Sequence, residues 1–169
     1  MRRHNKCWNP PPKDSLKLNV DAHSWSDGHW GLGLVLRRDD GHCVGAVTRV
    51  RKGNDDATLA EAMGLQEALE LTKHYEMRRV IVEMDTNVVV HAVQNKKFPR
   101  NQWGKIVQSC AMCLDENKNF LIAWVGRTGN SVAPELAKRV VHEPNKDWVS
   151  HFRNCILHHI QKDVVYIVL

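Results

Sequence analysis

Three strand-like runs follow one another near the start of the chain, and their order constrains the fold more than any other feature. Apolar residues alternate with polar ones from Leu16 to Ala22, and two further apolar runs occupy positions 30–38 and 42–50. Asp27-Gly28 and Asp39-Asp40-Gly41 separate the runs, and Asp-Gly pairs favour tight turns. The sequence therefore predicts three antiparallel strands joined by hairpins.

The rest of the chain alternates between helical and strand-like patterns. A long helix is predicted at about 58–75, because apolar residues recur there at helical spacing, and apolar runs predict strands ending at Asp85 and spanning 120–125. Further helices are predicted at 86–94, 106–116 and about 131–141, with a loop at 126–129. The order β-β-β-α-β-α-α-β-α indicates an α/β fold in which a five-stranded mixed sheet carries helices on its faces.

Two glycines, Gly31 and Gly33, interrupt the second predicted strand. Glycine weakens a strand interior, because it has no side chain that can pack against neighbouring strands. The pair therefore indicates either a β-bulge or the close approach of another part of the backbone.

The two ends of the chain differ in composition from its middle. Residues 1–13 are basic and then proline-rich, which predicts a linker. Residues 14–141 contain all the predicted strands and helices, so they form the expected domain. Residues 142–169 form a C-terminal tail, in which positions 148–160 are compatible with one helix and positions 164–169 with an apolar strand or a disordered end.

Composition limits the classes of protein to which the chain can belong. Its 169 residues suffice for one domain, and 43% hydrophobic with 25% charged residues is typical of globular proteins. The formal net charge of +5 is compatible with a polyanionic partner. Five scattered cysteines favour reduced thiols, and the N-terminal residues lack the apolar run of a signal peptide. We therefore expect an intracellular protein, in the nucleus or the cytoplasm, that does not associate with membranes.

Three carboxylates, Asp21, Glu61 and Asp85, occupy positions where an acidic side chain needs an explanation. Asp21 lies within the first strand, where Asp is uncommon, and Glu61 shares the apolar face of the long helix with Leu65. Asp85 ends a strand of the buried type, and ligands of α/β sheets gather beyond such strand ends. Three converging carboxylates would form a hard oxygen site of the kind that binds Mg²⁺ or Mn²⁺.

Each carboxylate also has a purely structural explanation. Thr58 and Glu61 fit the capping-box pattern of a helix start, and Asp85 fits an N-cap between a strand and a helix. Asp21 is compatible with the polar side of its strand. Against the capping box, a carboxylate that faces a core needs a partner, and a metal ion is one such partner.

Four motifs follow one another in a characteristic order. They are Leu18-Asn19-Val20-Asp21, Leu59-Ala60-Glu61-Ala62, Val82-Glu83-Met84-Asp85 and the segment from Trp124 to Ala133. With this order and the predicted strands and helices, the chain resembles the ribonuclease H superfamily, type 1. It looks most like the plant domains attached to non-LTR retroelement reverse transcriptases. The resemblance covers roughly residues 14–141 and implies the ribonuclease H-like fold, and Trp8 to Pro12 is similar to the linker that precedes such domains.

The resemblance also implies an activity. Asp21, Glu61 and Asp85 match three of the family's four metal-binding carboxylates, which implies two Mg²⁺ or Mn²⁺ ions at this site. The implied reaction is the hydrolysis of RNA in an RNA–DNA hybrid. The chain would act as a monomer or as part of a larger polyprotein.

The fourth carboxylate of the family is normally an Asp, at the position where this chain has Pro134. Proline is tolerated in the first turn of a helix, so the substitution suits the backbone. Glu135 is the next residue, but its side chain points about 100° further round a helix. We therefore expect the substitution to impair cleavage.

Candidate contacts to nucleic acid come from two segments. The last motif contains Arg127 and Asn130, and a basic, aromatic stretch contains Lys96, Lys97 and Trp103. Charge mixed with aromatic rings is typical of nucleic-acid surfaces, although a solvated connector is the favoured explanation of the second segment.

Two other functions stay open. A binding or vestigial domain would keep the fold and its basic surface but cleave little, and Pro134 favours that alternative. A small-molecule enzyme on a similar fold is disfavoured, because the sequence has no glycine-rich phosphate loop.

Overall fold

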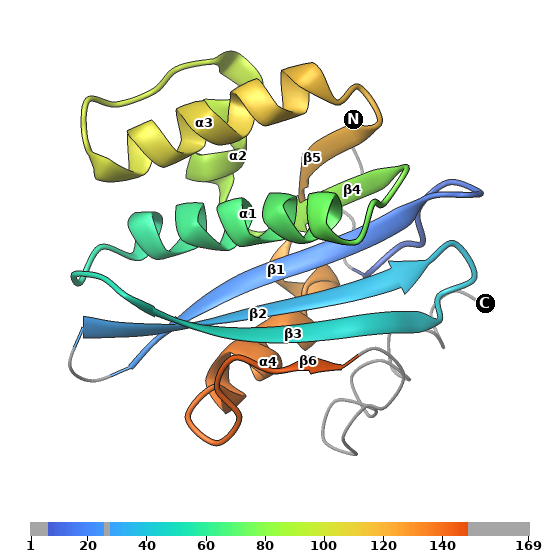
Figure 1. The fold of residues 1–169 in the computed structure, drawn as a ribbon, viewed down its shortest axis with the longest axis horizontal. Helices are drawn as coiled ribbons and strands as arrows, with labels where there is room; N and C mark the ends of the chain where they lie inside the picture. The colour runs from blue at the N-terminus through green and yellow to red at the C-terminus, as the bar shows by residue number, and fades with distance from the viewer. Residues whose placement is uncertain (1–6, 26–27, 149–169) are drawn as a thin grey trace.

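A mixed sheet of six strands organises residues 7–25 and 28–148, the part of the chain that the computed structural model describes (Figure 1). The strand order is β5-β4-β1-β2-β3-β6. β1, β2 and β3 are antiparallel neighbours, whereas β4 and β5 run parallel to β1. The strands are β1 (Leu16–Ser24), β2 (His29–Arg38), β3 (Cys43–Lys52), β4 (Val80–Met84), β5 (Phe120–Trp124) and β6 (Asp147–Trp148). The predicted α/β fold with a mixed sheet is confirmed.

The strand count of five is corrected to six. β6 is a two-residue strand that pairs antiparallel with the middle of β3, and Arg49 of β3 holds Asp147 through an ion pair of 2.5 Å. Trp148 therefore lies in an edge strand and does not begin a helix. Two residues are too few to give a period, so the sequence pattern could not predict this strand. The rest of the predicted C-terminal helix and the apolar end lie outside the described residues.

Helices cover both faces of the sheet within the described residues. α1 packs on one face with α2 and α3 beside it, and α4 packs on the other face (Figure 1). α3 begins at residue 102 and not at 106 as predicted, because the Asn101 side chain caps it by accepting from the Gly104 N–H at 2.9 Å. The helices are α1 (Ala57–His74), α2 (Asn87–Asn95), α3 (Gln102–Glu116) and α4 (Val132–Arg139), with a 3₁₀ turn η2 (Arg127–Gly129).

Within the described residues, the alternation of side chains along the strands gives two apolar cores. Leu18 and Val20 of β1 face α1 in the larger core, and Val35 of β2 packs with Val132 and Leu136 of α4 in the smaller one. Because successive strand residues point to opposite faces, the polar residues that alternate with Leu18 and Val20 lie on the α4 face. Asp21 is one of them.

The close backbone approach indicated by Gly31 and Gly33 is confirmed. A Cβ atom at Gly33 would overlap the carbonyl oxygen of Ala133, and one at Gly31 would overlap that of Ala137. The α4 backbone therefore rests directly on β2. Since Gly33 pairs with Asp21 across the sheet, this contact brings the start of α4 next to that carboxylate.

The N-terminal segment differs from a simple linker at Trp8. This side chain is only 1% exposed, and its ring lies against Arg37 of β2. The described part of the segment therefore adds to the fold.

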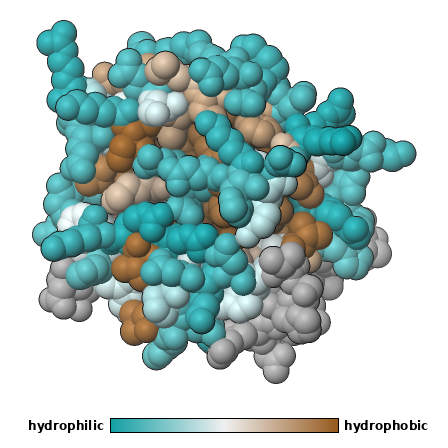
Figure 2. Space-filling model, in the orientation of Figure 1, coloured by the Kyte–Doolittle hydropathy of each residue, from teal (hydrophilic) through white to brown (hydrophobic). Residues whose placement is uncertain are grey.

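The surface that Figure 2 shows mixes hydrophilic side chains with small groups of hydrophobic ones. Within the described ranges, no helix is long and apolar enough to cross a membrane.

Candidate metal centre

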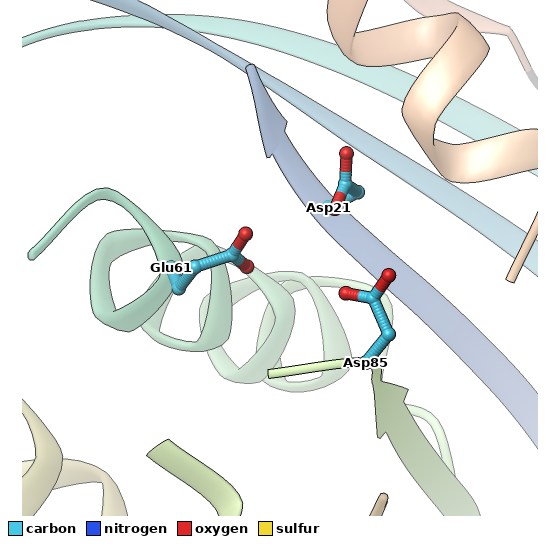
Figure 3. A group of neighbouring side chains, drawn as sticks. All are labelled: Asp21, Glu61 and Asp85. Carbon is cyan, nitrogen blue, oxygen red and sulfur yellow. The ribbon is translucent and has the colours of Figure 1, made fainter. Parts of the chain in front are cut away.

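The three candidate carboxylates converge from separate elements (Figure 3). One carboxylate oxygen from each of Asp21, Glu61 and Asp85 lies within 4.8 Å of the other two. β1 and β4 are parallel neighbours in which Val20 pairs with Met84, so the next residues lie side by side: Asp21 within β1, and Asp85 just beyond the carboxyl end of β4. Glu61 reaches the same point from the first turns of α1.

Glu61 does not cap its own helix. α1 begins after Asp56, whose carboxylate accepts from the backbone N–H groups of Thr58 and Leu59 at 2.9 and 3.3 Å. The capping-box explanation is therefore wrong. Instead, the Oε2 atom of Glu61 is buried and has no hydrogen-bond partner among the described residues. Burial, and next the negative charges of Asp21 and Asp85, raise the pKa of Glu61 to about 9.

The two aspartates are also held in an environment that disfavours their charge. Burial, and next the charge of Asp85, raise the pKa of Asp21 to about 7, although Lys138 and Arg127 oppose the shift. Burial raises the pKa of Asp85 as well. The N-cap explanation for Asp85 is wrong, because Thr86 occupies that position.

This donor set fits a divalent cation. Carboxylate oxygens are the hard ligands that Mg²⁺ and Mn²⁺ prefer. A bound cation would favour the charged forms that burial disfavours at all three carboxylates, and that mutual repulsion also disfavours at Asp21 and Glu61. The Oε2 atom of Glu61 is a buried acceptor without a hydrogen-bond partner among the described residues, so it is available as a ligand atom.

A cavity of about 480 Å³ opens over the carboxylates, and its wall includes Arg127, Asn130 and Pro134. Pro134 thus lies beside the three acids, where it offers no ligand atom. Glu135 points to Lys138 instead, with 3.3 Å between its Oε1 atom and the lysine Nζ atom.

Asn130 links the loop after β5 to β1 beside the carboxylates. Its side chain is 1% exposed, and its Nδ2 atom donates to the carbonyl oxygen of Val20 at 3.0 Å. The Nδ2 atom is therefore bonded to β1 next to Asp21, while the residue also lines the cavity. Its contact to nucleic acid stays a prediction. Arg127 lines the same cavity.

The other predicted contacts lie away from the cavity. Lys96 follows α2 and pairs with Asp115 of α3, with 2.6 Å between Nζ and Oδ2, and Lys97 is exposed beside it. Trp103 is half-buried and packs against the larger core. The structure does not bring these three residues to the carboxylates.

Sequence reasoning missed Lys138, whose positive charge lowers the pKa of Asp21. The available signal was its spacing, because Lys138 lies one helical turn after Pro134 and so shares a face with it.

Similarity to known proteins agrees with this geometry. The family described as reverse transcriptase-like matches residues 19–140. No curated protein is similar enough to count as a match.

Solved structures share the fold at low sequence identity. RNase H1 from Halobacterium salinarum NRC-1 is 21% identical with a TM-score of 0.67, covering 76% of this chain and 98% of that one. LC11-RNase H1 in complex with an RNA/DNA hybrid is 20% identical with a TM-score of 0.65, covering 74% and 95%. The prototype foamy virus protease-reverse transcriptase is 17% identical with a TM-score of 0.61, covering 86% of this chain and 23% of that one.

These matches place the chain among proteins whose sheet, helices and element order it shares. The family match spans most of the described domain, from β1 to the end of α4. The chain belongs to the reverse transcriptase-like family and has a ribonuclease H-like fold.

Proposed function

We propose that the protein is a nucleic-acid-binding domain of the ribonuclease H type that hydrolyses RNA in RNA–DNA hybrids with Mg²⁺ or Mn²⁺. The single observation that carries the proposal is the convergence of Asp21, Glu61 and Asp85 within 4.8 Å on the wall of an open cavity. A similar fold in a hybrid-bound RNase H1 supports the choice of substrate.

Asp21, Glu61 and Asp85 would hold the cations, and two ions suit this donor set. Bound cations would supply an activated water and stabilise the leaving oxygen. The chain's own residues hold the ligands in place: Asn130 ties to β1 beside Asp21, and the indole N–H of Trp124 donates to the backbone oxygen of Asp85 at 3.1 Å.

Arg127 would give this acidic site its attraction for phosphate. Its charge lies at the cavity wall and lowers the pKa of both aspartates, so it is close enough to neutralise part of their field. The exposed Lys97, near the start of α3, would extend the positive surface toward a bound duplex.

Cleavage would be impaired at the position of Pro134. The proline lies on the cavity wall but has no ligand atom, and Glu135 is paired with Lys138. The same observation favours a second candidate function, a nucleic-acid-binding remnant of a retroelement that cleaves weakly or not at all.

We also propose a finer placement from the order of the four motifs. The chain would be a type 1 domain from a plant non-LTR retroelement, with its domain at residues 14–141. It would act inside the cell as a monomer or within a larger polyprotein.

The test is cleavage of a labelled RNA–DNA hybrid with Mg²⁺, Mn²⁺ or EDTA. We expect slow cation-dependent cleavage that Asp21→Asn abolishes. The matched control Asp40→Asn makes the same change in the β2–β3 turn, outside the cavity, and should cleave like the wild type. Hybrid binding without cleavage would favour the remnant. A protein that neither binds nor cleaves the hybrid would contradict both functions.

A further inference from the structure

A second cluster of polar side chains lies on the α4 side of the sheet, and the proposed function does not use it. Its members come from β1, β2 and β4, and all are less than 10% exposed. Charged side chains that are this deeply buried require close partners. The cluster consists of Lys17 (6% exposed), Asn19 (0%), Arg37 (0%) and Glu83 (7%).

Hydrogen bonds within the cluster join the two strands that carry the aspartates. The Nδ2 atom of Asn19 donates to Oε2 of Glu83 at 2.9 Å, and Nζ of Lys17 lies 3.1 Å from Oε1 of the same glutamate. Asn19 precedes Asp21 by two residues, and Glu83 precedes Asp85 by two. Each metal-site strand thus carries a cluster residue on the same face as its aspartate.

Trp8 closes the cluster from outside. Its indole N–H donates to Oδ1 of Asn19 at 2.9 Å, and the guanidinium carbon of Arg37 lies 4.1 Å from its ring centroid. The carbonyl oxygen of Asn9 accepts from Nζ of Lys17 at 2.6 Å. Trp8 therefore supplies a donor to Asn19 and Asn9 supplies an acceptor to Lys17, in addition to the partners that Arg37 and Glu83 provide within the cluster. The ring of Trp8 adds a cation–π contact with Arg37.

The same segment supports the loop that carries Arg127. A Cβ atom at Gly129 would lie 3.2 Å from the carbonyl oxygen of Cys7 and 2.5 Å from Cγ2 of Val125. The backbone before Trp8 therefore rests against η2. Arg127 and Asn130, on either side of Gly129 in this loop, line the metal-site cavity.

We propose that Trp8 is a positioning residue of the metal centre. By covering the buried cluster, Trp8 stabilises the pairing of β1 with β4. The backbone before it, at Cys7, packs against η2. The N-terminal segment is then part of the site's support, and its displacement lowers the affinity of the site for cations. This inference rests on the proposed function, because it requires that the three carboxylates bind a cation.

The test compares Trp8→Ala with Trp148→Ala in the full chain. Trp148 is half-buried against the smaller core at the far edge of the sheet, so it is a matched control for the loss of an indole. Two quantities are measured: Mn²⁺ and Mg²⁺ affinity by titration, and hydrogen exchange at the amides of Gly129 and Asn130. These amides bond to Gly126 and Arg127 at 2.8 and 3.1 Å.

For Trp8→Ala we expect cation affinity to fall on the order of 10-fold, as when outer partners of metal ligands are removed. Exchange at the two amides should rise by a similar factor, and Trp148→Ala should leave both quantities near wild type. Trp8→Phe keeps a ring over Arg37 but loses the N–H, so it should recover part of both effects. If Trp8→Ala does not fold, Trp8→Phe carries the same comparison with a smaller expected loss.

The proposal is overturned if Trp8→Ala, or Trp8→Phe in its place, keeps wild-type cation affinity, or if Trp148→Ala weakens it as much. If the wild type binds no cation at all, the proposed function fails as well. The exchange measurement separates the two failures, because it reports whether Trp8 holds η2 irrespective of any cation.

Discussion

At the scale of single residues, Glu61 has the most strongly raised pKa of the three carboxylates. In the metal-free folded protein its pKa is raised from 4.5 to about 9, first by burial and then by the neighbouring aspartates. The unfolded chain releases this proton near pH 4.5, so the folded state binds more protons between these two values. Metal-free stability should therefore fall as the pH rises through this window.

The variant Glu61→Gln tests this reasoning. In EDTA, the wild-type free energy of unfolding should fall from about pH 5 to about pH 8 by up to about 1.4 kcal/mol per pH unit relative to the variant, which keeps Asp21 but has no proton to lose at position 61. Saturating Mg²⁺ should restore the free energy of unfolding of the wild type and leave that of the variant unchanged. Urea unfolding at several pH values measures both effects, and parallel curves for the two proteins would contradict the assigned burial.

Pro134 supplies the second prediction at this scale. Pro134→Asp adds a carboxylate at the cavity wall, and the helix should accept it because Asp is favourable in a first turn. We expect faster single-turnover cleavage at saturating enzyme with little change in hybrid affinity. In the unmodified chain Mn²⁺ should support more activity than Mg²⁺, because Mg²⁺ demands nearly ideal octahedral geometry.

Glu135→Gln is the matched control for that experiment. Because Glu135 pairs with Lys138, its loss should leave cleavage by the wild type unchanged. Cleavage that is already fast in the wild type and that Glu135→Gln abolishes would show that Glu135 replaces the missing Asp.

The chemistry of single residues also determines how much of the candidate site can be predicted from the sequence. Asp21, Glu61 and Asp85 stand out in the sequence itself, because a carboxylate on an apolar face or at a strand end needs a partner. Asn130 was harder to assign, because a motif gives a residue's position and not its exposure. Only the fold reveals that its amide is buried against the carbonyl of Val20.

At the scale of elements, the contact between α4 and β2 sets the position of the cavity wall. Gly33→Ala would push a methyl group into the backbone of α4 at Ala133, the residue before Pro134. Neither backbone has room to move, so we expect a loss of about 1–3 kcal/mol in stability, the usual range for overpacking.

Gly45→Ala is the control for that substitution. Gly45 lies in β3, where the nearest atom to an added Cβ is 3.7 Å away on the side chain of Leu36. This variant should unfold within about 0.5 kcal/mol of the wild type. Urea unfolding of the three proteins measures the difference, and equal losses for both glycines would mean that α4 is not held against β2 as described.

Elements were predictable in proportion to their length and their period. The strands β1 to β3 and the helix α1 span nine or more residues, so apolar runs, turn residues and helical spacing together locate them. β6 has two residues, and its place depends on contacts with β3. The packing of Trp8 depends on buried charges that β1, β2 and β4 bring together only when the chain folds.

At the scale of the whole molecule, the net charge of +5 contrasts with the acidic cavity. A nucleic acid would be attracted by Lys and Arg spread over the surface and repelled locally by unneutralised carboxylates. Affinity for a hybrid should therefore come mainly from phosphate contacts and weaken with salt, by roughly 10- to 100-fold between about 50 and 200 mM for a few such contacts.

This balance of charges makes a prediction about Asp85→Asn. The variant removes one negative charge that faces the cavity, so in EDTA it should bind a labelled hybrid at least as tightly as the wild type, with the same slope against salt. Asp40→Asn removes the same charge from the exposed β2–β3 turn near the start of β1, and it should leave affinity unchanged. Fluorescence anisotropy across a salt series measures all three proteins. Weaker binding by a folded Asp85→Asn variant would mean that Asp85 itself contacts the hybrid, and that the carboxylates do more than hold cations.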